Sequence, residues 1–166
     1  GKIFYKIACT YFNEQQWESC IKQLEHAIRV HKPQPEYSRL MGECKMQLGL
    51  FKDAALYFAN MVRVRPKSMA GWEALIRCLF NANSFEDALE QTNTALKMTK
   101  GKPIFLFYKS AVLFALNKGK EAILQLEDAM RQAPKLLKRF VELNPSILQS
   151  QQVVDVIARY KRNKSI

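Results

Sequence analysis

The sequence predicts an all-α protein built from four copies of one helical hairpin. Three observations support this prediction. Small residues recur every 34 positions, aromatic residues occupy the same place in successive copies, and each strong helix breaker falls between two stretches with helical spacing. Small residues keep two independent registers through four copies, which chance does not produce. The length of 166 residues suits one compact domain with a real core.

The recurring small residues predict how the two helices of each copy pack. One set at the 34-residue interval is Cys20, Ala54, Ala88 and Ala122, and a second is Ala27, Met61, Ala95 and Ala129. A third set is Ala8, Gly42, Ile76 and Ala111, the last displaced by one residue. Small side chains let two helix axes approach closely. Two short antiparallel helices per copy are therefore expected.

The predicted repeats cover residues 1–34, 35–68, 69–102 and 103–134. Turn residues at 47–49, 81–84 and 117–119 separate the two helices of the later copies. Pro66 and Pro134 end second helices, and residues 100–103 have this role in the third copy. Because Phe107 and Ala111 come one residue late, we expect a one-residue slip in the fourth copy, compensated by a shorter turn before Ala122.

Residues 135–166 depart from the repeat. Their apolar side chains keep helical spacing first at Leu136, Leu137, Phe140, Val141 and Leu143, and then at Val153, Val154 and Ile157. A stack of repeats leaves an apolar flank at its end, which a helix with a polar back can cover. We therefore expect one or two C-terminal capping helices over residues 135–166.

This pattern resembles the tetratricopeptide repeat. The third copy matches the signature of that family at Trp72, Leu75, Phe85, Ala88 and Ala95, and the second copy matches it at Gly42, Phe51, Ala54, Phe58 and Pro66. The resemblance implies a right-handed α-solenoid in which the first helix of each repeat lines a concave groove. It also implies a scaffold for protein–protein interaction that binds a peptide or helix of a partner in this groove.

The resemblance further implies which side chains face the groove. The candidates for partner binding are Tyr5, Phe12, Arg39, Glu43, Met46, Glu73, Arg77, Phe80 and Tyr108. The apolar members would contact the partner and the charged members would fix its orientation. Packing within each hairpin is an alternative role for Phe12, Met46 and Phe80, and this alternative stays open at this point.

Some members of the family hold the C-terminal carboxylate of a chaperone with a clamp of lysine and asparagine residues. The corresponding positions here are Tyr5, Cys9, Leu40, Ala70 and Ala74. Since none of these side chains is a cation, the sequence disfavours a receptor of that type.

The net charge of +11 raises an alternative function. Residues 131–166 contain eight basic and two acidic side chains; the basic ones include Lys135, Lys138, Arg139, Arg159, Lys161, Arg162 and Lys164. Glu36, Glu43 and Glu73 would repel a phosphate backbone from the groove. Nucleic acid is therefore disfavoured there, whereas binding of nucleic acid or an acidic partner by the basic C-terminal region stays open.

The predicted first helix suggests a third function. Ile3, Phe4, Ile7 and Tyr11 crowd it without a preceding cap. We therefore expect either that the natural chain continues upstream or that this face mediates self-association within a larger complex.

The sequence contains no pattern typical of catalysis. His26 and His31 are predicted on different faces of one helix, and no phosphate-binding glycine loop is present. The four cysteines form no C-x-x-C pair and are interpreted as core residues of a reducing compartment. Enzyme activity, cofactors and metals are thus not expected. With no secretory signal and no run of about 18 apolar residues, a cytoplasmic or other intracellular location is predicted.

Overall fold

The computed structural model describes residues 2–32 and 34–164, which form helices and connecting turns with no strand among them. Residues 1, 33, 165 and 166, which belong to the predicted first repeat and C-terminal segment, lie outside this description. The chain divides into two compact units, one ending at Asn83 and the other beginning at Ser84. The predicted all-α class is confirmed over the described residues.

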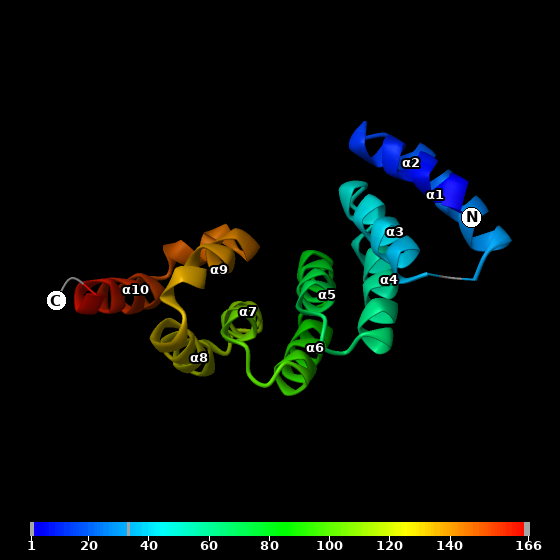
Figure 1. The fold of residues 1–166 in the computed structure, drawn as a ribbon. Helices are drawn as coiled ribbons and strands as arrows, with labels where there is room; N and C mark the ends of the chain where they lie inside the picture. The colour runs from blue at the N-terminus through cyan, green and yellow to red at the C-terminus, as the bar shows by residue number, and fades with distance from the viewer. Residues whose placement is uncertain (1, 33, 165–166) are drawn as a thin grey trace. The chain divides into compact units, whose positions relative to one another are not determined.

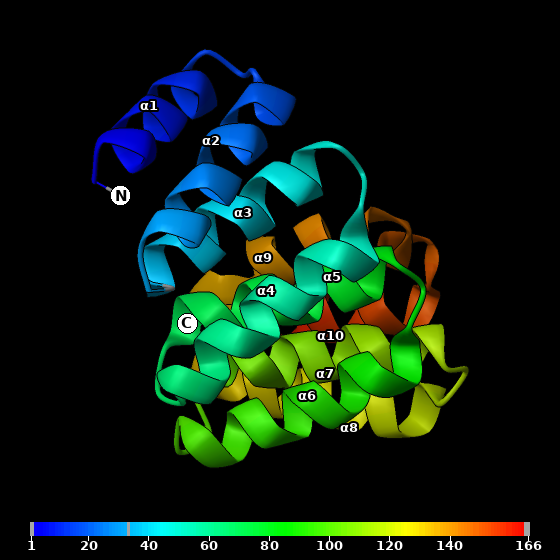
Figure 2. The same ribbon diagram turned by 90° about the vertical axis from the view of Figure 1, so that its right-hand side faces the viewer.

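The first unit contains five helices. They are α1 (Lys2–Asn13), α2 (Trp17–Val30), α3 (Pro35–Gln47), α4 (Phe51–Val64) and α5 (Met69–Asn81). α1 packs along α2 and α3 packs along α4, while α2 also contacts α3 and α4 contacts α5 (Figure 1 and Figure 2). The unit therefore contains two complete hairpins, α1–α2 and α3–α4, followed by α5.

The second unit contains five further α-helices and two short 3-10 helices. They are α6 (Phe85–Met98), α7 (Pro103–Ala115), α8 (Gly119–Gln132), η1 (Pro134–Leu136), α9 (Leu137–Leu143), η2 (Pro145–Gln149) and α10 (Gln151–Lys164). α7 contacts α6 and α8, α9 packs on α7, and α10 packs on α8 (Figure 1). The Phe107 and Phe140 rings lie 5.9 Å apart between α7 and α9. The predicted capping helices are thus confirmed.

The buried face of α10 differs from the predicted one in phase. Val153 and Val156 are buried, whereas Val154 is 38% exposed. The 3-10 helix η2 places buried Ile147 before α10 and α10 starts afresh at Gln151. The buried face of α10 therefore contains Val153 and Val156, which are three residues apart. The positions of the apolar residues in the sequence did not by themselves identify this face.

Close helix approach explains the small residues of the repeat. Nine of them are fully buried, namely Ala8, Cys20, Ala27, Ala54, Ala88, Ala95, Ala111, Ala122 and Ala129. Gly42 shows the constraint directly, because a Cβ atom added there would lie 2.7 Å from the Phe58 ring. The α3 and α4 axes are so close that no side chain fits between the Gly42 backbone and this buried ring.

The backbone repeats with the same period as the side chains. A left-handed residue follows the first helix of each hairpin at Gln15, Gly49, Asn83 and Asn117, with φ of 59°, 75°, 59° and 60°. The next amide donates to a carbonyl five residues earlier at Gln16, Leu50 and Lys118, at 2.8 to 2.9 Å. These bonds satisfy carbonyls at the helix end that would otherwise lack a partner.

The predicted slip in the fourth copy is wrong. α7 begins 34 residues after α5, and α8 begins 34 residues after α6. Ser110, not Ala111, is the residue 34 positions after Ile76, and it is also small and fully buried. Its hydroxyl donates to the Ala122 carbonyl at 2.7 Å. The apparent slip arose because Ala111 and Phe107 resemble the expected residue types more than their neighbours do.

Candidate partner-binding trough

In the first unit α1 and α3 form the walls of a concave pocket of about 240 Å³. Its lining comes from Tyr5, Cys9, Phe12 and Asn13 of α1 and from Glu36, Arg39, Leu40 and Glu43 of α3. Four of the nine predicted partner-binding residues, Tyr5, Phe12, Arg39 and Glu43, therefore surround one cavity. They come from two helices that the repeat pattern places side by side.

A second hollow of about 450 Å³ continues this pocket toward the start of α1. It is lined by Lys2, Tyr5, His31, Lys32, Gln34, Glu36 and Tyr37. Tyr5 and Glu36 line both hollows. The two hollows together are called the α1–α3 trough below. Its apolar half contains Cys9, Phe12 and Leu40, and its basic end contains Lys2, His31 and Lys32.

Helical spacing and ring packing position the trough side chains. Tyr5, Cys9 and Phe12 are four and three residues apart and therefore share one face of α1. The Tyr5 ring lies 5.2 Å from the Tyr37 ring. The Phe12 ring meets the Trp17 ring edge-on at 5.1 Å. Both rings thus have fixed neighbours within the hairpins, although each is only partly buried.

Phe12 therefore has the packing role that the sequence left open, and its role in partner binding stays a prediction. It packs on Trp17 of its own hairpin and also lines the pocket.

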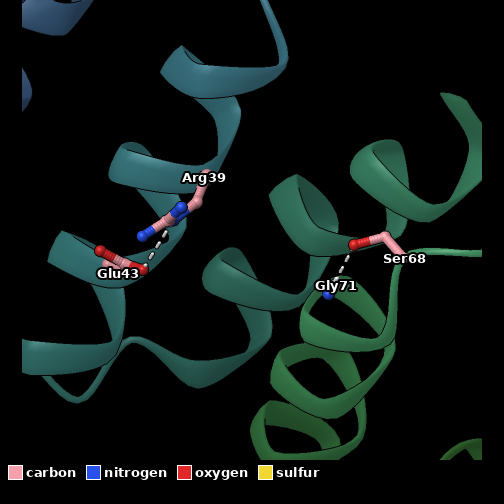
Figure 3. A network of polar contacts seen from close by, with 4 residues as sticks. All are labelled: Arg39, Glu43, Ser68 and Gly71. Atoms are coloured by element: carbon pink, nitrogen blue, oxygen red, sulfur yellow. Dashed lines mark hydrogen bonds and ion pairs between the residues drawn. The ribbon is translucent and has the colours of Figure 1, made fainter. Parts of the chain in front are cut away.

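Ion pairs neutralise part of the trough. The Arg39 Nε donates to Glu43 Oε1 at 3.2 Å, four residues along α3 (Figure 3). Glu36 Oε1 lies 3.8 Å from the Arg65 Nη2. Lys2 and Lys32 have no ion-pair partner among the residues that the structure describes. Positive charge therefore remains uncompensated at the basic end.

Tyr5 joins the two parts of the trough as a neutral phenol. Its pKa is raised to about 12, chiefly by partial burial and in addition by the neighbouring Cys9 and Glu36, while Arg39 acts in the opposite direction. The Tyr5 hydroxyl therefore stays protonated at neutral pH. It can donate a hydrogen bond to a carbonyl of a bound chain.

The remaining predicted residues of the first unit lie elsewhere. Met46 follows the pocket on α3 and is partly exposed, and Arg77 is exposed on α5. Glu73 and Phe80 are partly buried on α5, each with contacts of its own. None of these four lines either hollow of the trough. Their role in partner binding stays a prediction.

Tyr108 differs from the expectation that it offers an exposed contact. Its side chain is 3% exposed within α7. The expectation depended on the one-residue slip; without the slip, Phe107 is the residue 34 positions after Glu73. Phe107 is itself buried against Phe140 of α9. Residues of α7 are therefore not part of the candidate site.

Sequence reasoning did not assign Lys32 or Tyr37 to the trough. Lys32 lies in the connection between α2 and α3, whereas the groove residues that the family resemblance implies lie on first helices. Tyr37 is buried, lines the basic end and packs against the Tyr5 ring. His31, Lys32 and Gln34 shortly precede α3, which forms one wall of the trough. This nearness in sequence could have indicated that the connection lines the trough.

Another hollow of about 770 Å³ lies on α4. Apart from Lys45, its lining comes from that single helix, including Asp53, Leu56, Tyr57 and Arg63. A bound segment would touch one wall there, whereas the α1–α3 trough offers two. The trough is therefore the better candidate despite its smaller pocket.

Two classes of site are not found among the described residues. No group of three or more His, Cys, Asp or Glu side chains is arranged to hold a metal ion there. No helix in the described ranges has the length and apolar character needed to cross a membrane.

Comparisons with known proteins identify the family and show the fold. A model of the tetratricopeptide repeat matches residues 40–103 and 74–136, more than half of the chain. A crystal structure of MamA aligns over 99% of this chain and 93% of its own, with TM-score 0.75 and 14% identity. MamA 41-end from Desulfovibrio magneticus RS-1 aligns over 99% and 94%, with TM-score 0.68 and 16% identity.

A further solved structure, YrrB, is a TPR protein with an unusual peptide-binding site. It aligns over 96% of this chain and 73% of its own, with TM-score 0.67 and 14% identity. At such identities the likeness shows the fold alone. The search of curated protein sequences found no match.

Proposed function

Because the chain belongs to the tetratricopeptide repeat family, we propose that it is a protein-interaction scaffold whose α1–α3 trough binds an extended segment of a partner protein. One observation supports this proposal most. Tyr5 and Phe12 of α1 surround the same cavity as Arg39 and Glu43 of α3. Two apolar contacts and two charged groups thus converge on one space, as recognition of a peptide requires.

The dimensions of the trough suit a short extended segment. The 12 residues of α1 span about 18 Å at about 1.5 Å per helical residue. An extended chain rises about 3.3 Å per residue, so five or six partner residues would cover this length. Both walls are helices, and the ordering cost of binding therefore falls mainly on the partner.

The lining offers partners to an extended backbone as well as to side chains. The Tyr5 hydroxyl and the Asn13 amide can donate to carbonyls, and the Glu43 carboxylate can accept from amides. Cys9, Phe12 and Leu40 leave an apolar recess for one side chain. The proposal requires no reaction, because these groups act by positioning the bound segment.

Panning a displayed library of random peptides against the chain tests the proposal. Enriched peptides are synthesised, and their affinity is measured by fluorescence polarisation. Phe12→Ala and Arg39→Glu are each expected to weaken binding about tenfold or more, since a lost buried contact or a reversed charge costs about 1.4 kcal/mol or more. Lys22→Glu is the control, because Lys22 is exposed on α2 and lines neither hollow.

Two results would overturn the proposal. One is a library from which no peptide is enriched. The other is a set of peptides that bind Phe12→Ala and Arg39→Glu as tightly as they bind the wild type.

Self-association through α1 is a second candidate function. Ile3 is 72% exposed and Ile7 is 39% exposed, and both lie on the same helix. We expect sedimentation to show a concentration-dependent dimer that an Ile3→Ser, Ile7→Ser variant abolishes. A monomer at all concentrations in both proteins would eliminate this candidate.

Binding of nucleic acid or an acidic partner by the basic C-terminal region has less support than peptide binding in the trough. Lys138 lies 3.9 Å from Glu142, and Arg159 lies 3.6 Å from Glu127. These pairs compensate part of the charge that nucleic acid would use. Binding at this region would weaken steeply as the salt concentration rises and would not be affected by Phe12→Ala. The same variants therefore distinguish it from binding in the trough.

A further inference from the structure

The basic end of the α1–α3 trough holds more positive than negative charge. Lys2 and Lys32 line it, both are exposed, and neither has an ion-pair partner among the described residues. The carboxylate that lines this end is Glu36, which pairs with Arg65 at 3.8 Å. A bound anion would therefore meet two lysines whose charge is not already used.

The apolar half has the opposite character. Cys9, Phe12 and Leu40 provide its walls. The charges at this half, Arg39 and Glu43, are joined by their own hydrogen bond at 3.2 Å. They leave little net charge for a ligand to neutralise, so this half favours an uncharged apolar side chain.

We propose that the segment bound in this trough carries an acidic side chain about three residues from an apolar one. This inference rests on the proposed function and adds the chemistry of the partner. Lys2 and Cys9 are seven residues apart on α1, which is about 10 Å at 1.5 Å per residue. Three residues of extended chain cover the same distance. Tyr5, which lines both hollows, lies between Lys2 and Cys9 along α1, and its hydroxyl can bond to the intervening backbone.

An acidic peptide fits the trough better than a nucleic acid does. A nucleic acid carries a phosphate at every nucleotide, and these phosphates would pass Glu36 and Glu43 as well as the lysines. A peptide can place one carboxylate at the basic end and none beyond it. The two lysines also differ from the five positions of the chaperone clamp, none of which is cationic in this chain.

Peptide panning with two variants tests the inference. In the first variant, Lys2→Glu and Lys32→Glu reverse the charge of the basic end. In the matched control, Lys6→Glu and Lys22→Glu make the same change in net charge at exposed residues outside both hollows. Wild type and control are expected to enrich peptides with Asp or Glu about three residues from Leu, Ile, Phe or Met. The first variant is expected to enrich Lys or Arg at that place.

A synthetic wild-type ligand then gives the size of the effect. Replacing its acidic residue by the neutral amide should weaken binding to the wild type about tenfold, the typical loss for a charge-assisted hydrogen bond. The same replacement should change binding to the first variant less than about twofold.

Alkylation of Cys9 reports where the peptide binds. Cys9 is partly exposed in the apolar half, whereas Cys20, Cys44 and Cys78 are fully buried. A bound peptide should therefore slow the reaction of native protein with iodoacetamide, as mass spectrometry of Cys9 would show.

The possible outcomes separate the inference from the proposed function. Peptides that protect Cys9 but show no acidic preference would overturn the inference and leave the proposed function standing. The inference also fails if the control variant loses the acidic preference, because net charge would then explain it. Enriched peptides that leave Cys9 unprotected would overturn both.

Discussion

α1 and α7 are first helices of hairpins in the two units, and they differ in how much of them is buried. Ala8 is the one buried residue of α1, whereas nine residues of α7 are buried. α9 packs on α7, while α1 lines an open trough with α3. The same hairpin can therefore present a binding surface or serve as core. What differs is how many helices pack on it, since α6, α8 and α9 contact α7 whereas α2 and α3 contact α1.

The sequences of the two helices already contain this difference. α7 reads PIFLFYKSAVLFA, with one charged residue, and is apolar around its whole circumference. A helix of that kind is buried on all sides. α1 has lysines at both Lys2 and Lys6 and polar residues at its end. Function is therefore expected at α1, where polar and apolar residues share one open face.

The largest expected effect compares a phenylalanine from each helix. Phe107→Ala should destabilise the protein by about 3–5 kcal/mol, because this fully buried ring packs on Phe140 and its loss leaves a cavity. Phe12→Ala should cost about 1–2 kcal/mol, since Phe12 is only partly buried. Urea unfolding followed by far-UV circular dichroism measures both. Equal losses would mean that the trough is as closed as α7.

A second comparison uses one glycine from each unit. Gly42→Ala should destabilise by about 1–3 kcal/mol, because the new methyl group would meet the buried Phe58 ring at 2.7 Å. Gly119→Ala should instead be neutral or stabilise by up to about 1 kcal/mol, since a Cβ there has no neighbour within 4 Å. Thermal unfolding measures the two shifts. A harmless Gly42→Ala would show that α3 and α4 pack less closely than described.

The fold could be predicted from the sequence because two kinds of residue show the same period, the small residues and the turn residues. The buried alanines and the left-handed turns both repeat every 34 positions. The one-residue slip was wrongly predicted because the fourth copy was aligned by residue type. Ala111 was chosen over Ser110, although a serine whose hydroxyl finds a backbone carbonyl can be buried equally well.

The candidate site was predictable in part, for a similar reason. Tyr5, Phe12, Arg39 and Glu43 lie at helix positions that the repeat defines, and they line one pocket. Lys32 lies in a connection between helices, whose path depends on how hairpins join. Tyr108 was assigned through the one-residue slip, and the residue at the unshifted position, Phe107, packs on Phe140 of α9. Contacts set by covering segments do not follow from the period of a repeat.

A smaller effect is expected at the caps of two helices. Ser68 precedes α5 and its Oγ accepts a hydrogen bond from the Gly71 amide at 3.2 Å (Figure 3). Ser84 precedes α6 in the second unit and makes no such side-chain bond. Ser68→Ala should therefore cost about 1 kcal/mol, and Ser84→Ala should cost less. Equal losses in urea unfolding would show that the cap at Ser68 is not formed in solution.

The smallest effect concerns Tyr5 in the open trough at alkaline pH. Its pKa is about 12 in the folded chain, against the usual value of about 10 in an unfolded one. Between these values the unfolded chain loses the phenol proton first, so the contribution of Tyr5 to stability is lost as pH rises from about 10 to about 12. Tyr5→Phe lacks this loss. Its stability should therefore fall less steeply than that of the wild type between about pH 9 and about pH 11, by a modest amount because Tyr5 is partly exposed.

Tyr57, whose pKa is also raised by burial, is present in both proteins and cancels in the comparison. Urea midpoints at the two pH values measure the difference, and identical slopes would mean that the Tyr5 hydroxyl is as open to water as an unfolded tyrosine.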